Sequence, residues 1–240
     1  MHENTLVFDA LILAGGRSSR LGGVPKQSLV FHGQTLLERS VTAAAGARQC
    51  VVVGDAGSLA FPSGTPRRPS GESLLPGLLT CREDPPFAGP AAAIAAGLDT
   101  LAGAGGGAPY TLVLACDMPL ASQAVNVLTN ALAGSAAGAG RSVGGAMAVS
   151  EDGRAQPLVG LYSTGELTRA CRELAGRNAL VNGSVCALLA NLDVQLVTVP
   201  AGSTSDVDTW DDAAALGIAA GTQYESQDRR TGGANVGGNS

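Results

Sequence analysis

With 240 residues, of which 45% are hydrophobic and only 15% charged, the chain is long and apolar enough to bury a substantial core, which excludes disorder for most of its length. The formal net charge of −5 argues against broad nucleic-acid binding, which requires a basic face. The chain has only two histidines, and its five cysteines form no Cys-x-x-Cys pair, so the pattern argues against a transition-metal site.

The N-terminus lacks the features of a secretion signal, because no basic region precedes the first apolar run and Asp9 lies within that run. Residues 88–109 are rich in alanine and glycine, which are weak membrane anchors, and Asp99 lies among them. A helix of a globular domain is therefore expected there. We expect a reduced, cytoplasmic protein whose partners include neither a membrane nor nucleic acid.

The first apolar run, residues 6–13, stops at a pair of glycines and predicts a buried strand that ends in a tight loop. Residues 14–26 of this loop contain no acidic residue but carry three cations, two hydroxyls and four glycines that leave amide groups uncovered. Free amides and fixed cations suit the oxygens of a triphosphate. The cations are Arg17, Arg20 and Lys26, and the hydroxyls are those of Ser18 and Ser19.

The residue order of this segment excludes two common phosphate-binding loops. A Walker loop ends in Gly-Lys-Ser/Thr, whereas Lys26 follows Pro25, and the Gly-x-Gly-x-x-Gly fingerprint of dinucleotide-binding proteins is absent. The alternative is a surface turn with solvated cations, which the spacing alone leaves open.

The rest of the chain alternates between strand and helix patterns, which is the opening of a doubly wound sheet. We expect a single α/β domain over residues 1–220 with a Rossmann-like, mostly parallel sheet, followed by a disordered, glycine-rich tail at 221–240. The segment 131–145, rich in Gly, Ala and Ser, is expected to be a mobile loop. Further strands are predicted at residues 50–54, 78–82, 111–116, 147–149, 157–162 and 194–199. Helices are predicted at residues 34–47, 91–101, 166–174 and 184–189, and from about residue 122.

The strand at 111–116 runs directly into Asp117, and ligands of open parallel sheets gather beyond the carboxyl ends of strands. Asp117 and the loop after residue 13 should therefore share one edge. A carboxylate that faces bound phosphates needs a cation between them, which implies Mg²⁺. The alternative reading is that Asp117 only caps the following helix. Four aspartates within residues 206–212 are also typical of a helix N-terminus.

The loop Leu13-Ala-Gly-Gly-Arg-Ser-Ser-Arg-Leu-Gly22, followed by Lys26, closely resembles the signature of the MobA-like nucleotidyltransferases. Cys116-Asp-Met-Pro-Leu120 resembles the metal-binding aspartate motif of that family. Asp84 and Gly89-Pro90 match a motif that borders the nucleobase, and Asp206-Val-Asp-Thr209 resembles a late motif that helps to hold the metal. The resemblance covers residues 9–217 and implies a three-layer α/β/α fold of the nucleotide-diphospho-sugar transferase type.

The resemblance also implies roles for individual residues. Asp117 and Asp208 would hold Mg²⁺, and Arg20, Lys26 and Asp117 would be the catalytic residues. The implied nucleotide-binding residues are Leu13, Ala14, Gly15, Gly16, Ser18, Arg20, Lys26, Asp84, Gly89 and Asp117.

The implied reaction is Mg²⁺-dependent transfer of a nucleoside monophosphate from a triphosphate to a phosphorylated acceptor, with release of pyrophosphate. Within the family, transfer from GTP to molybdopterin is favoured. Pro25 stands where the family usually has Asp, and Asp208 where guanylyltransferases more often have Asn. Both departures point to the cytidylyltransferases of isoprenoid synthesis, so CTP is the alternative. A nucleotide-binding module without turnover is a third reading, against which both metal aspartates argue.

Overall fold

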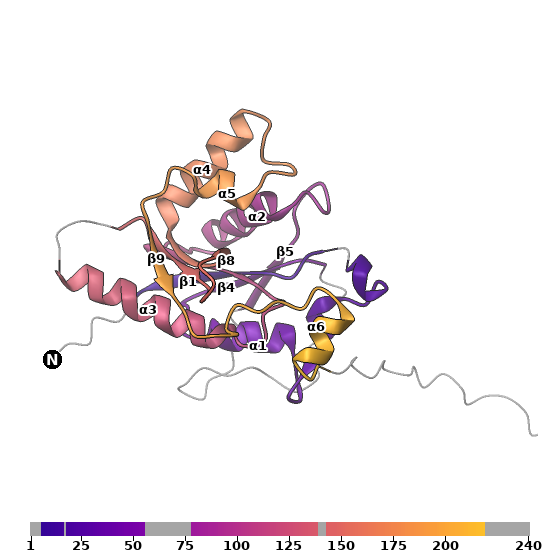
Figure 1. The fold of residues 1–240 in the computed structure, drawn as a ribbon. Helices are drawn as coiled ribbons and strands as arrows, with labels where there is room; N and C mark the ends of the chain where they lie inside the picture. Colours follow the sequence, from indigo (N-terminus) through magenta and orange to yellow (C-terminus); the bar gives the residue numbers. More distant parts are fainter. Residues whose placement is uncertain (1–5, 17, 56–77, 139–142, 219–240) are drawn as a thin grey trace, which may run out of the picture.

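The computed structural model describes residues 6–16, 18–55, 78–138 and 143–218. Within these ranges a seven-stranded sheet forms the centre of the molecule, with the order β5-β4-β1-β6-β8-β7-β9 (Figure 1). The strand β8 is antiparallel to both of its neighbours, and the other pairings of the sheet are parallel. The expected α/β fold with a mostly parallel sheet is confirmed.

The strands of the central sheet lie where the apolar runs predicted them, to within one or two residues. Residues 34 and 35, which were predicted to begin a helix, instead belong to a short hairpin strand, and the helix starts at Leu36. Strands β1, β4 and β6 read as almost continuous apolar segments because helices cover both faces of a parallel sheet. The strands of the sheet are β1 (Phe8–Leu13), β4 (Cys50–Val53), β5 (Leu78–Cys81), β6 (Tyr110–Ala115), β7 (Gly145–Val149), β8 (Ala155–Ser163) and β9 (Val194–Thr198). A separate short hairpin is made by β2 (Val30–Phe31) and β3 (Gln34–Thr35).

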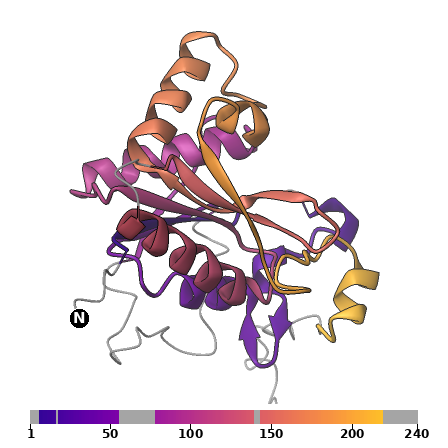
Figure 2. The same cartoon turned by 60° about the vertical axis from the view of Figure 1, so that its left-hand side comes forward.

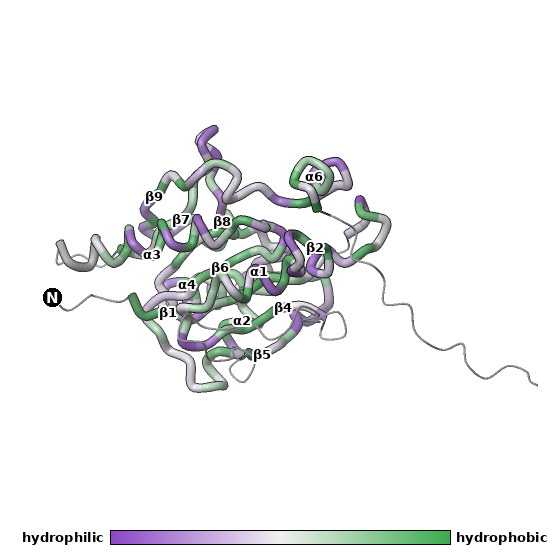
Figure 3. The backbone as a smooth tube through the Cα atoms, turned by 90° about the horizontal axis from the view of Figure 1, so that it is seen from below, coloured by the Kyte–Doolittle hydropathy of each residue, from purple (hydrophilic) through white to green (hydrophobic). Residues whose placement is uncertain are grey.

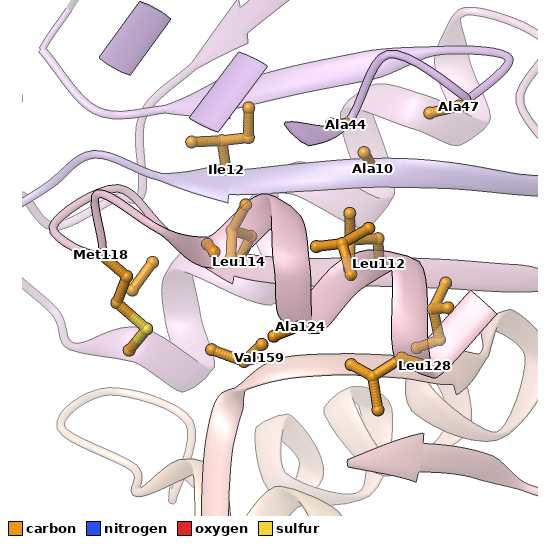
Figure 4. Packing of buried hydrophobic residues seen from close by; sticks show 14 of the residues in the cluster. Ala10, Ile12, Ala44, Ala47, Leu112, Leu114, Met118, Ala124, Leu128 and Val159 are labelled. Carbon is orange, nitrogen blue, oxygen red and sulfur yellow. The ribbon is translucent and has the colours of Figure 1, made fainter. Parts of the chain in front are cut away.

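Helices form a layer on each face of the sheet, so the three-layer arrangement is present (Figures 1 and 2). Side chains of α1 and α3 pack on one face, together with residues such as Ile12, Leu114 and Val159 (Figure 4). Side chains of α2, α4 and α5 pack on the other face around Leu11 and Val113. These helices are α1 (Leu36–Ala43), α2 (Pro90–Gly103), α3 (Ala121–Gly138), α4 (Thr164–Gly176) and α5 (Val185–Leu189).

A third, smaller core fastens the last described helix, α6 (Trp210–Ala215), beside the hairpin β2–β3 (Figure 3). Leu21 and Leu29 from the loop after β1 meet Val207 and Ala213 in this core, and each of these side chains is almost fully buried. The chain segment that carries Asp208 is thereby anchored to the loop that carries Lys26.

Two expectations need comment. The segment 131–145 was expected to be a loop, but residues 131–138 continue α3, because alanine is a strong helix former and outweighs the glycines there. The expected tail at 221–240 lies outside the described residues. In the described part of the chain, none of the helices combines the length and the apolar character that crossing a bilayer requires.

The order of the strands places the site. In the sheet, β1 has β4 on one side and β6 on the other. The strand order therefore changes direction between β1 and β6, and the carboxyl ends of these two strands flank this switch point. Leu13 is paired with Ala115 in the register of these two strands. The loop after β1 and the residues after β6 therefore leave the sheet at the same edge.

Asp9 is a buried carboxylate with a structural role. It is 1% exposed, and it accepts hydrogen bonds from the backbone amides of Gln49 (3.2 Å), Gly107 (3.1 Å) and Ala108 (3.0 Å). These bonds tie the start of β1 to the turns before β4 and β6, at the opposite end of the strand from the glycine pair.

We expect Asp9→Ala to lower the free energy of unfolding by about 2–4 kcal/mol, because the amides at this site lose their shared acceptor. Urea denaturation measures the change. Asp9→Asn, which keeps one acceptor oxygen, should cost less. A loss below about 0.5 kcal/mol in the alanine variant would contradict the structural role of Asp9.

Candidate active site

The loop after β1 folds back on itself and delivers Lys26 to the edge of the sheet. Gly22 and Gly23 have φ angles of 66° and 84°, which favour glycine, and they follow a single helical turn at Ser19–Leu21. The amides of Leu21 and Gly23 both donate to the carbonyl of Ser18, at 3.0 and 3.1 Å. The amide of Lys26 donates to Ser18 Oγ at 3.4 Å, so Ser18 fixes both ends of this turn.

A late segment of the chain returns to the same edge. The amide of Val207 donates to the backbone carbonyl of Asp117 at 3.1 Å. The next residue, Asp208, donates its amide to Asp212 Oδ2 at 3.1 Å, and Thr209 and Asp212 form a capping box that starts α6. Asp212 therefore has the helix-capping role that the aspartate cluster suggested, while Asp208 points elsewhere.

Lys26 is the centre of the site. Its ammonium donates to Asp117 Oδ2 at 2.9 Å and also to Asp208 Oδ1. Arg20 Nη1 lies 3.3 Å from Asp208 Oδ2, but its side chain is 72% exposed, so this second ion pair is worth little. Burial by itself lowers the pKa of Lys26, yet the opposing charges and hydrogen bonds of Asp117 and Asp208 outweigh burial and raise it. Lys26 is also the only lysine in the chain.

These side chains face a cavity of about 280 Å³ at the ends of β1 and β6. Most of the residues that the resemblance proposed as site residues line this cavity. They are Leu13, Gly15, Gly16, Ser18, Arg20, Lys26, Asp117 and Asp208, accompanied by Gln27 and Cys116. Burial and the charge of Asp117 raise the pKa of the Cys116 thiol, which therefore stays protonated and is no nucleophile.

A second cavity, of about 420 Å³, continues from the first along the end of β1. The two cavities share Leu13, Gly15 and Gly16. The second is walled on its far side by the start of α2, and its lining includes Gly89, one of the residues that the resemblance proposed for nucleotide binding. Asp84 is exposed and lines neither cavity. The carboxylate that lines the second cavity is that of its neighbour, Glu83, which is 8% exposed. Ala14 lines an adjoining hollow behind the glycine pair.

Three carboxylates could hold a metal ion at the edge of the first cavity. Asp117, Asp206 and Asp208 each offer an oxygen, and these oxygens lie within 4.8 Å of one another. Asp117 Oδ1 is buried and has no hydrogen-bond partner among the described residues. Oxygen donors of this kind fit Mg²⁺. The carboxyl of Asp206 is partly desolvated although the residue is exposed, and this desolvation, followed by the charge of Asp117, raises its pKa.

Sequence reasoning missed Asp206 and Glu83 as site residues. Asp206 and Asp208 are the first and last residues of an Asp-Val-Asp motif. The spacing of two residues could have indicated that Asp206 lies near the metal site as well. Glu83 precedes Asp84, and no property of the sequence shows which of two adjacent carboxylates is buried.

The site combines a glycine-rich loop and a fixed lysine with acidic residues, at the switch point of a doubly wound sheet. This combination is that of a nucleotide-binding α/β protein. Residues 10–193 match the MobA-like NTP transferase domain, and the chain belongs to that family. The fold agrees. Molybdopterin-guanine dinucleotide biosynthesis protein A from Archaeoglobus fulgidus superposes with a TM-score of 0.58 at 19% identity, over 87% of this chain and 96% of that one.

Two further relatives are named for different activities. The 2-C-methyl-D-erythritol 4-phosphate cytidylyltransferase of Francisella tularensis superposes with a TM-score of 0.63 at 13% identity, over 88% of this chain and 98% of that one. A molybdenum cofactor guanylyltransferase of Acidiphilium cryptum (strain JF-5) is 44% identical over 48 residues. That match covers 20% of this chain and about a quarter (24%) of the curated relative.

Proposed function

We propose that the protein is a Mg²⁺-dependent nucleotidyltransferase, which transfers a nucleoside monophosphate from a triphosphate to a phosphorylated acceptor and releases pyrophosphate. The observation that supports this proposal most strongly is the position of Lys26. Its ammonium lies between two carboxylates in a cavity lined by a glycine pair. Cations and free amides bind the triphosphate, and the carboxylates provide ligands for the metal.

In this proposal each residue acts by position or charge. Lys26, Arg20 and the amides of Gly15 and Gly16 hold the triphosphate, while Asp117 and Asp208, joined by Asp206, hold Mg²⁺. When bound, Mg²⁺ neutralises charge on the phosphates. A phosphate monoester carries most of its second negative charge at pH 7, because its second pKa is about 6, so the acceptor needs no general base. Catalysis then depends on orientation and charge neutralisation.

GTP and molybdopterin are the substrates that we favour. The short match to a curated relative named molybdenum cofactor guanylyltransferase supports this choice. The cytidylyl reaction is the second candidate, because Pro25, Gln27 and Asp208 follow the cytidylyl pattern and the fold superposes on a cytidylyltransferase with a TM-score of 0.63.

Release of pyrophosphate tests the reaction. We expect pyrophosphate only when Mg²⁺, GTP and molybdopterin are all present, and we expect EDTA to stop its release. Replacing GTP by CTP, and molybdopterin by a polyol phosphate, tests the second candidate. Binding of triphosphates without pyrophosphate release under any of these conditions would favour the non-catalytic reading.

A further inference from the structure

Arg39, on α1, contacts the segment of the chain that carries Asp117. Its Nε donates a hydrogen bond of 2.6 Å to the backbone carbonyl of Pro119, two residues beyond Asp117. This segment is the turn between β6 and α3, and in the same turn the carbonyl of Asp117 accepts a hydrogen bond from the amide of Val207. A side chain of the helix layer therefore holds the turn from which the Asp117 carboxylate projects.

The same guanidinium contacts the third core of the molecule. The central carbon of the Arg39 guanidinium lies 4.8 Å from the centre of the Phe31 ring, and a cation is attracted to the face of an aromatic ring. Phe31 is buried and belongs to the core that fastens α6 beside the hairpin β2–β3. That core anchors both the loop that carries Lys26 and the segment that carries Asp208. Arg39 thus links these two segments to the turn after β6.

Arg39 is itself held in a defined place. Thr35 and Glu38, both buried, form a capping box that fixes the start of α1. Burial lowers the pKa of the Arg39 guanidinium, which stays charged because arginine does not lose its proton in proteins. Within the described residues no carboxylate forms an ion pair with it. The carbonyl of Pro119 and the ring of Phe31 are therefore the partners that orient its side chain.

We propose that Arg39 is a positioning residue of the metal site. By bridging Phe31 and the carbonyl of Pro119, it sets the distance between the turn that carries Asp117 and the segment that carries Asp208. The proposal rests on the proposed function, because it takes these two aspartates as ligands of Mg²⁺. Mg²⁺ requires a near-ideal octahedral set of oxygens, whereas Ca²⁺ accepts a more variable one. Without the bridge, the site should bind Mg²⁺ more weakly and discriminate less against Ca²⁺.

Two uncharged variants separate the hydrogen bond of Arg39 from its charge. In Arg39→Gln the amide nitrogen lies as many bonds from the backbone as Nε does in arginine, so it can keep the bond to Pro119. Arg39→Met carries a methyl group at that place and has no donor. Both variants remove the same positive charge and the contact of the guanidinium with Phe31, and both new residues are good helix formers. A difference between the two variants therefore reports the hydrogen bond alone.

The test is binding of Mn²⁺ alone, followed by the electron paramagnetic resonance of the free ion, with Mg²⁺ and Ca²⁺ as competitors. We expect Arg39→Met to bind Mn²⁺ roughly tenfold more weakly than the unaltered protein, which is the lower end of the effect of residues that support metal ligands, because Arg39 acts through the backbone. Its preference for Mg²⁺ over Ca²⁺ should fall as well. Arg39→Gln should keep the affinity and the preference of the unaltered protein.

Thermal unfolding of each variant shows whether it is folded at the temperature of the assay. Arg39→Leu, a second variant without a donor, replaces Arg39→Met if that variant does not fold, and unfolding of both would contradict a role confined to the metal site. Equal Mn²⁺ affinity in the donor-free variant and in Arg39→Gln would overturn the role of Arg39 while leaving the metal site intact. If the unaltered protein bound no Mn²⁺, the metal site of the proposed function would be contradicted, and the assignment of Arg39 with it.

Discussion

The Asp117→Asn variant should lose transfer activity by at least about a hundredfold while keeping its fold. Asp117 Oδ2 accepts from Lys26, and Oδ1 is the buried oxygen that is left for a metal ion. Asparagine keeps the shape but removes the charge, so the site attracts the metal less strongly and Lys26 loses a partner. Removal of one group that stabilises developing charge typically costs about 10²–10³ in kcat. Steady-state kinetics of both proteins at the same Mg²⁺ concentration, near half-saturation for the unaltered protein, measures the loss.

The fold should survive this substitution because the bond from Val207 reaches the backbone carbonyl of Asp117 and not its side chain. Asp211→Asn is the matched control, since Asp211 is an exposed carboxylate in the first turn of α6. The control should retain full activity, and both variants should unfold at the temperature of the unaltered protein. More than half of the normal kcat in Asp117→Asn would contradict the metal assignment.

The Lys26→Met variant should show two opposite changes. Affinity for a triphosphate should fall roughly ten- to a hundredfold, because a charge-assisted hydrogen bond to phosphate is worth about 1.5–3 kcal/mol. Affinity for Mn²⁺ without nucleotide should rise, because the ammonium no longer competes for Asp117 and Asp208. Titration calorimetry measures the first change, and the electron paramagnetic resonance of free Mn²⁺ measures the second.

The side-chain chemistry of Lys26 allows further checks. Lys26→Arg should be poorly tolerated, since a planar guanidinium does not replace a compact charge between two carboxylates. Because Lys26 is the only lysine, its labelling by an amine reagent can be followed at a single side chain, and bound Mg²⁺–GTP should slow it. Arg169→Met, on the exposed face of α4, is the control for the affinity measurements on Lys26→Met. Unchanged triphosphate affinity in Lys26→Met would remove the phosphate role.

Much of the fold followed from the sequence because the apolar runs coincide with the buried strands. The run that ends at Leu13 and the run that ends at Cys116 placed the loop and Asp117 at one edge, and their register in the sheet agrees. Parallel strands buried on both faces leave this continuous signal. The prediction of a loop from residue 131 was wrong, because the composition suggested a loop where local helix propensity continues α3 to Gly138.

The details of the site were less predictable because they depend on which atoms point into the cavity. The sequence predicted a phosphate-binding role for Lys26 and a metal-binding role for Asp117, and it could not show that these two side chains contact each other. The burial of Glu83 beside the exposed Asp84 depends on how the turn before α2 is placed next to Gly15. Contacts between segments far apart in the chain leave no local pattern.

Transfer of label from GTP tests the central claim most directly. The protein is incubated with Mg²⁺, molybdopterin and GTP that carries ³²P at either the α or the γ position. Nucleotidyl transfer predicts that the α label enters a dinucleotide product, while the γ label appears only in pyrophosphate, in equal amount. Transfer of the γ label to the acceptor, or its release as orthophosphate while the α label stays in GDP, would contradict the account.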